Sequence, residues 1–161
     1  MSPCPPAPWL DEVVGCLRRA FGNGLRAVVL FGSYARGEAR ADSDVDILVV
    51  AAGVSSDQLS RHRRARMALL PVLDRLPAPV SLIVRTPEEF SANLTPLLLD
   101  VCVDGVCLAG DDYFDPFRTR ALHALRESGL ERRKVGGTTM WLFSSAPSPS
   151  WALSWDGFHA G

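Results

Sequence analysis

Two hydrophobic periodicities alternate along this chain. Between residues 10 and 21, apolar side chains recur every three to four positions, which predicts a helix that ends at Gly22-Asn23-Gly24. Short runs rich in β-branched residues predict buried strands at 26–31, 44–50, 80–84 and 106–108. Strands separated by helical stretches indicate an α/β (α+β) fold, with a mixed sheet of about three to five strands flanked by helices.

Helical spacing between the predicted strands locates the connecting helices. They are expected at about 34–36, 55–76, 86–90, 95–104 and 117–125. Ser55 or Ser56 is positioned to cap the second of them, and Pro71 predicts a kink or a break because proline lacks the backbone N–H. Thr86-Pro87-Glu88-Glu89 combines a capping residue, a proline and first-turn acids, which is typical of a helix start.

The end of the chain differs from the rest in composition. Residues 1–135 are predicted to form one folded domain, and residues 136–161 a tail rich in Trp, Ser and Pro. Three of the four tryptophans lie in this tail, at Trp141, Trp151 and Trp155. An irregular segment that packs on the domain through its indoles is expected. An interface or a lid over a site is the alternative.

Composition and charge narrow the class of protein. The chain has 161 residues, of which 47% are hydrophobic and 22% charged, as expected for one globular domain with its own core. A net charge of -1 gives no overall attraction to nucleic acid or to an anionic membrane. The proline-rich start carries no signal pattern, and no apolar run is long enough to span a bilayer, so a cytoplasmic protein without membrane contact is expected.

The cysteines and histidines do not predict a zinc site. Cys4, Cys16, Cys102 and Cys107 form no C-x-x-C pair, and the three histidines are scattered. Free, partly buried thiols are therefore expected.

Two carboxylates stand two positions apart at the start of the predicted 44–50 strand. Because side chains alternate along a strand, Asp44 and Asp46 point the same way, while Val45 and Ile47 face the core. Adjacent carboxylates repel one another, and a divalent cation would relieve that repulsion. Carboxylate oxygens suit Mg²⁺ (or Mn²⁺), which also binds phosphate oxygens. Asp44 and Asp46 are therefore the predicted metal ligands.

Gly32 and Ser33 lie where the 26–31 strand ends and the next helical turn begins. Glycine allows a backbone to approach a ligand closely. The amides of a helix start and the Ser33 hydroxyl are suited to bind a terminal phosphate. Phosphoryl or nucleotidyl transfer requires at least groups that bind phosphate and groups that bind a metal ion. Here the first lie at the end of one predicted strand and the second at the start of the next.

Together these features resemble the Gly-Ser-x10-Asp-x-Asp signature of minimal nucleotidyltransferases, which are small members of the DNA-polymerase-beta-like superfamily. Ten residues separate Gly32-Ser33 from Asp44-x-Asp46. The resemblance implies that residues 1–135 are a nucleotidyltransferase domain. It implies transfer of a nucleoside monophosphate from a Mg²⁺-bound nucleoside triphosphate, with ATP expected, to an unknown acceptor. In that picture Asp44 and Asp46 are catalytic, and Gly32 and Ser33 bind the nucleotide. Arg36 either helps to neutralise phosphate charge or is an ordinary surface arginine.

One position departs from the family pattern. Active members carry a third carboxylate, in an apolar-Asp-apolar pattern before a phrase such as Thr-Pro-Glu-Glu-Phe, and this chain has Ser81 there. A serine hydroxyl is neutral at pH 7, binds Mg²⁺ poorly and is no general base. Asp100, Asp104 or a partner could supply the acid instead. Two hypotheses follow: a nucleotidyltransferase, or a catalytically weakened module that binds a nucleotide or a partner.

The acceptor stays open between a protein hydroxyl, a small molecule and an RNA end. Small members of this superfamily often modify a HEPN-type partner, as an antitoxin modifies a toxin, so the resemblance suggests a protein of the HEPN-toxin type. The basic cluster at 61–66 is expected to be a solvated helix face, with contact to a polyanion such as RNA as the alternative. It lacks the aromatic residues that would stack bases. The charged run 131–134 is expected to be a surface turn.

Overall fold

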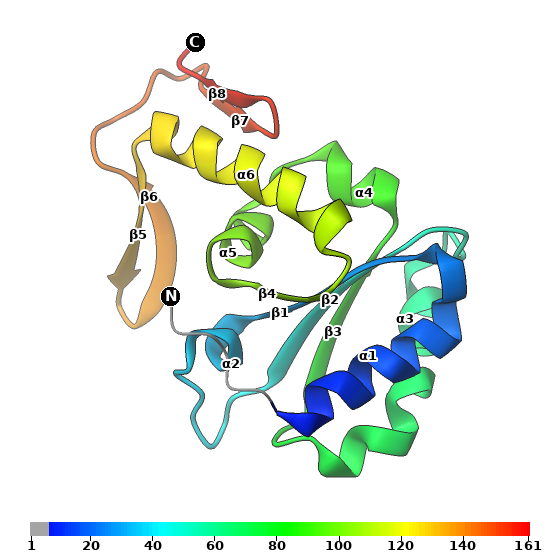
Figure 1. The fold of residues 1–161 in the computed structure, drawn as a ribbon. Coiled ribbons are helices and arrows are strands. Elements are labelled where there is room, and N and C mark those ends of the chain that lie inside the picture. The colour runs from blue at the N-terminus through cyan, green and yellow to red at the C-terminus, as the bar shows by residue number, and fades with distance from the viewer. Residues whose placement is uncertain (1–6) are drawn as a thin grey trace.

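A four-stranded mixed sheet forms the centre of the molecule. The computed structural model describes residues 7–161 (Figure 1). The strands are β1 (Leu25–Phe31), β2 (Val45–Ala51), β3 (Val80–Arg85) and β4 (Val106–Ala109), in the order β3-β2-β1-β4. β1 pairs antiparallel with β2 and β4, whereas β2 and β3 are parallel. The predicted α/β class with a mixed sheet is thereby confirmed.

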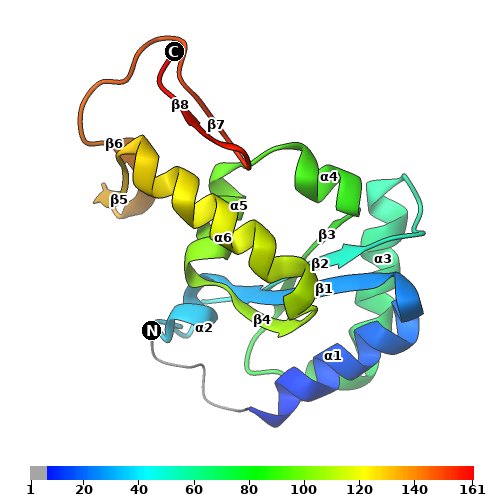
Figure 2. The same ribbon diagram turned by 45° about the horizontal axis from the view of Figure 1, so that its top comes forward.

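Helices cover both faces of this sheet (Figure 2). α1 (Pro8–Phe21) and α3 (Gln58–Leu69) pack on one face, against strand residues such as Val28 and Ile47. The other face carries α4 (Pro87–Ala92), α5 (Pro96–Asp104) and α6 (Asp111–Ser128). Short helical turns complete the connections: η1 (Gly22–Gly24), α2 (Gly32–Arg36) and η2 (Leu70–Arg75). Because both faces are covered, β1 and β2 are buried on both sides.

The C-terminal residues form two β-hairpins. β5 (Leu130–Val135) pairs with β6 (Thr138–Phe143), and β7 (Ala152–Ser154) pairs with β8 (Gly157–His159). In Figure 1 the second hairpin lies against α6. Its Trp155 is 5% exposed and packs against Phe90 and Phe117, with ring centroids 5.3 and 5.0 Å away. The tail is therefore not irregular throughout, since it contains β6, β7 and β8, although Trp155 does pack on the domain and residues 144–151 form no strand. The surface turn expected at 131–134 was wrong, because these residues belong to β5.

The helix boundaries show where local patterns succeeded and failed. α3 ends at Leu69 and passes into η2 at Pro71, so the predicted break occurs. The predicted caps Ser55 and Ser56 were wrong, because the Asp57 side chain caps α3 by accepting from the Ser60 amide at 2.9 Å.

Three arginines of the basic cluster at 61–66 form hydrogen bonds with other parts of the fold. Arg61 is 1% exposed and bonds both carboxylate oxygens of Glu89 at 2.6 Å. Arg64 donates to the Ala20 carbonyl at 2.6 Å, and Arg66 to the Val80 carbonyl at 3.4 Å. The expected solvated face was therefore wrong for Arg61, whereas Arg63, Arg64 and Arg66 are exposed, as expected.

Two further observations bear on the sequence predictions. None of the helices in residues 7–161 is long and apolar enough to cross a bilayer. Cys16, Cys102 and Cys107 are free thiols, and burial raises the pKa of Cys102 and of Cys107 to about 12. Cys4 and most of the proline-rich start lie outside the described residues.

Candidate nucleotide and metal site

The junction between β1 and α2 brings the Gly32-Ser33 pair close to Asp46, a carboxylate within β2. β1 pairs with β2 so that Phe31 faces Asp46, and the chain turns immediately afterwards at Gly32. Gly32 has a φ of +71°, a conformation that residues with a Cβ rarely adopt. A Cβ at this position would lie 2.3 Å from Oδ2 of Asp46. Glycine is therefore required here both by the backbone conformation and by the space that Asp46 occupies.

Asp44 lies close enough to Asp46 to influence the ionisation of Asp46. Asp46 is half-buried in β2, and Asp44 is exposed immediately before that strand. Burial raises the pKa of Asp46 above its ordinary value, and the charge of Asp44 raises it further. A hydrogen bond from Ser81 and the positive charge of Arg36 act in the opposite direction. The pair thus carries an unfavourable concentration of negative charge, which a divalent cation would relieve.

Ser81 lies beside Asp46 on the neighbouring strand. β2 and β3 pair in parallel with Asp46 opposite Ser81, so the strand position assigned from the sequence is the one next to the carboxylate pair. Both side chains are on the face of the sheet that carries α4, α5 and α6, because their neighbours Leu48 and Ile83 pack there. A serine hydroxyl thus stands where a third carboxylate would complete the group.

The other acids considered from the sequence are occupied elsewhere. Asp100 and Asp104 both pair with Arg132, at 3.0 and 2.5 Å. Glu89 pairs with the buried Arg61 and also completes a capping box with Thr86. Within residues 7–161, no cluster of three or more Asp, Glu, His or Cys side chains is arranged to hold a metal ion. The suggestion that Asp100 or Asp104 supplies the third carboxylate was therefore wrong for this structure.

The sequence profile of the family described as "Nucleotidyltransferase domain" matches residues 10–104, more than half of the chain. This chain belongs to the nucleotidyltransferase domain family. The resemblance read from the Gly-Ser and Asp-x-Asp motifs is thereby confirmed.

Curated relatives share parts of this nucleotidyltransferase domain. A candidate protein adenylyltransferase of Methanocaldococcus jannaschii is 36% identical over 93 residues, which cover 57% of this chain and 63% of that protein. The protein adenylyltransferase MntA of Thermococcus cleftensis is 64% identical over 33 residues, 20% of this chain and 31% of that protein. The chain therefore spans less than two thirds of the length of these relatives.

Solved structures show the same fold. A crystal structure of a MntA–HpeT toxin–antitoxin complex superposes with a TM-score of 0.52 at 22% identity, covering 73% of this chain and 87% of that one. A toxin–antitoxin crystal structure with AMP-PNP gives 0.50 at 24% identity, with the same coverage of both chains. At this identity the likeness establishes the nucleotidyltransferase fold and nothing finer.

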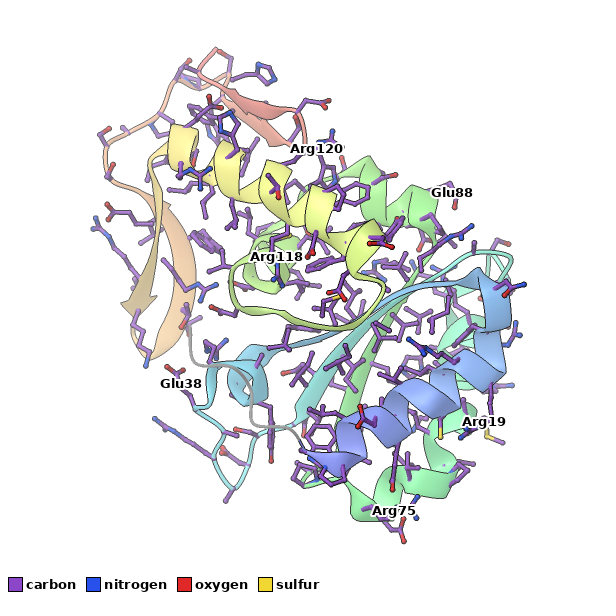
Figure 3. All side chains as sticks on the ribbon, in the orientation of Figure 1. Arg19, Glu38, Arg75, Glu88, Arg118 and Arg120 are labelled. Carbon is purple, nitrogen blue, oxygen red and sulfur yellow. The ribbon has the colours of Figure 1, made fainter. Side chains whose placement is uncertain are left out.

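A cleft of about 700 Å³ opens beside the Gly-Ser turn of the nucleotidyltransferase domain. Ser33 and Arg36 line it from α2. Arg36 has a side chain 35% exposed and bonds Glu38 at 3.0 Å and Asp104 at 3.5 Å. Figure 3 shows Glu38 on the side of α2 that faces the β5–β6 hairpin. Arg36 is thus both a cleft residue and a partner of surface acids.

The far wall of the cleft was not predicted from the sequence. It comes from the β5–β6 hairpin and contains Arg132, Arg133, Lys134, Gly137 and Thr139. The hairpin follows the part of the chain that matches the nucleotidyltransferase family, which ends at residue 104. A charged run with little apolar alternation does not look like a strand, so only the pairing with β6 reveals it.

Proposed function

We propose that this protein binds a nucleoside triphosphate together with Mg²⁺ at the edge formed by Gly32, Ser33, Asp44 and Asp46. The observation that best supports this proposal is the close approach of Gly32 to Oδ2 of Asp46. The proposed phosphate-binding turn and a proposed metal ligand are therefore adjacent. Arg36 adds a positive charge whose influence reaches Asp46. ATP is the expected nucleotide.

The side chains at this edge suit a divalent cation. A half-buried carboxylate whose proton affinity rises through burial and a neighbouring carboxylate, beside a cleft rich in basic side chains, fits an Mg²⁺ ion that arrives already bound to phosphate oxygens. Mn²⁺ would suit the same oxygens. Asp44 and Asp46 would hold the ion, which would neutralise negative charge on the phosphates.

The proposed reaction transfers a nucleoside monophosphate. An acceptor hydroxyl oxygen forms a bond to the α-phosphorus, the bond from that phosphorus to the oxygen shared with the β-phosphate breaks, and pyrophosphate leaves. The hydroxyl proton passes to solvent or to a base on the acceptor, because Ser81 is not a base at neutral pH.

A protein is the acceptor best supported by similarity. The curated relatives are named as protein adenylyltransferases, and the solved neighbours are described as parts of toxin–antitoxin pairs. We therefore infer a protein partner of the HEPN-toxin type, with adenylate transferred to one of its hydroxyl groups.

A second candidate function is favoured by Ser81. In a site with two carboxylates, a metal–nucleotide complex can bind while the attacking hydroxyl lacks both a metal ligand and a base. The protein would then be a nucleotide-binding module, or a module that binds its partner, with weak turnover.

Incubation with nucleotides labelled at the α-phosphate tests the first candidate. The folded protein, Mg²⁺ or Mn²⁺ and a lysate of the source cells would be combined, beside a control that carries Asp44→Asn and Asp46→Asn. Labelled protein that requires both carboxylates would support the transferase and identify its acceptor. No transfer, from a protein that still binds Mg²⁺–ATP, would reject efficient transfer and favour the binding module.

A further inference from the structure

The β5–β6 hairpin turns one side of the Gly-Ser edge into a basic cleft. Among the described residues, five basic side chains line this cleft and one acidic side chain, Glu38. The basic residues come from both walls: Arg36 and Arg40 on the α2 side, and Arg132, Arg133 and Lys134 on β5.

Arg132 fixes the hairpin against α5. It pairs with Asp100 at 3.0 Å and with Asp104 at 2.5 Å, and its guanidinium lies 5.0 Å from the Trp141 ring centroid. The Trp141 indole donates to Asp100 at 3.0 Å, so β5 and β6 are both attached to α5. Asp104 also accepts from Arg36 at 3.5 Å, which joins the hairpin to the phosphate-binding turn through one carboxylate. The second wall is therefore held in a defined place, and Arg132 is a positioning residue.

Arg40 and Lys134 are the cations left to meet a ligand. Arg36 and Arg132 share Asp104, and Arg133 pairs with Glu131 at 2.7 Å. In the part of the chain that the structure describes, neither Arg40 nor Lys134 forms an ion pair. Both are exposed and line the cleft from opposite walls. Exposed cations that face each other across a cleft attract an anion held between them.

The size and lining of the cleft indicate the class of ligand. Its volume of about 700 Å³ falls in the range of sites for one small molecule. Within residues 7–161, the lining contains no aromatic side chain on which a base could stack, which argues against a nucleic-acid strand. Hydroxyl groups of Ser33, Ser43 and Thr139 add hydrogen-bonding partners for phosphate oxygens.

We propose that the β5–β6 hairpin is the second half of the triphosphate site, and that Lys134 and Arg40 bind the β- and γ-phosphates from opposite walls. This inference rests on the proposed nucleotide binding at Gly32-Ser33 and Asp44-x-Asp46. It adds a polyphosphate subsite, built partly from a segment beyond the family domain, that selects triphosphates over monophosphates.

Equilibrium dialysis with radiolabelled ATP and, separately, radiolabelled AMP in Mg²⁺ tests the subsite. The test variant is Arg40→Gln with Lys134→Gln. The control is Arg18→Gln with Arg63→Gln, which removes the same charge from α1 and α3, outside the cleft. The test variant should weaken ATP binding roughly ten- to a hundredfold, since each lost contact is a charge-assisted one, and AMP binding by less than about twofold. The control should match the wild type, and circular dichroism should show all three proteins folded.

Inorganic tripolyphosphate provides a second probe. It should displace labelled ATP from the wild type and compete much less well with ATP on the test variant.

The outcomes separate the two claims. Wild-type ATP affinity in the test variant would overturn the subsite and leave the proposed function standing. Equal loss of ATP and AMP would also overturn it, because the variant would then disturb the whole site. No ATP binding by the wild type would overturn the proposed function, and this inference with it.

Discussion

Replacing Ser81 by aspartate should convert the two-carboxylate edge into a three-carboxylate one. Ser81 pairs with Asp46 across β2 and β3, and neighbouring strands lie about 4.8 Å apart. At that separation two unit charges repel by about 1 kcal/mol in water and about 3.5 kcal/mol at an effective dielectric constant near 20. Asp46 is half-buried, so Ser81→Asp should destabilise the metal-free protein by about 1–3 kcal/mol.

Mg²⁺–ATP should restore the stability that Ser81→Asp loses, and the added carboxylate should increase the rate of adenylate transfer. A ligand that binds only the folded state stabilises it by mass action, so thermal unfolding should show a larger Mg²⁺–ATP stabilisation for Ser81→Asp than for the wild type. A carboxylate that accepts the acceptor proton is worth about 10²–10⁴ in rate, so transfer of labelled adenylate should rise by that factor.

Ser81→Asn is the matched control for this experiment. Asparagine resembles aspartate in shape but carries no charge and cannot act as a base at neutral pH. The assay is transfer of α-phosphate label at saturating ATP, with equal amounts of each folded variant. Transfer by Ser81→Asp that is no faster than by Ser81→Asn would refute the reasoning that Ser81 limits catalysis.

Three other predictions concern the fold and the titration of the site. Arg61→Met should lower the free energy of unfolding by about 3 kcal/mol in denaturant titrations, because it leaves Glu89 without its partner and removes bonds from a side chain that is 1% exposed. Gly32→Ala should weaken Mg²⁺–ATP binding at least about tenfold, since the added Cβ meets Asp46 at 2.3 Å, whereas Gly15→Ala in α1 should bind normally. The raised pKa of Asp46 means that its protonated form is favoured in the folded state, so this group contributes stability at low pH that is lost as pH rises through the raised pKa. Mg²⁺ affinity should show the opposite trend and fall as pH drops through that pKa, which calorimetry at several pH values would detect.

Local patterns predicted the central sheet because its signals are local. The strands from Leu25 to Ala109 are short apolar runs bounded by turn residues, and all four were located to within about a residue. The Gly-Ser and Asp-x-Asp motifs lie at the two ends of the connection between the antiparallel strands β1 and β2, so their proximity followed from strand alternation and the spacing between them. The role of Ser81 came from a family pattern, and the parallel pairing of β2 with β3 places it beside Asp46.

Features that depend on distant partners were missed. Arg61 looks like a surface residue in its own helix, and only Glu89, 28 positions later, explains its burial. The β5 strand has a charged sequence, and its place beside the cleft depends on contacts from Arg132 back to Asp100 and Asp104. Sequence spacing carries little information about such pairs, because the fold has to form before they meet.

Calorimetric titration of Mg²⁺–ATP into the wild-type protein and into the Asp44→Asn/Asp46→Asn variant measures whether these two carboxylates bind a metal–nucleotide complex. We expect saturable binding to the wild type and its loss in the variant, with both proteins folded. Absence of binding to the wild type, or equal binding to both proteins, would contradict the assignment of this edge as a metal–nucleotide site.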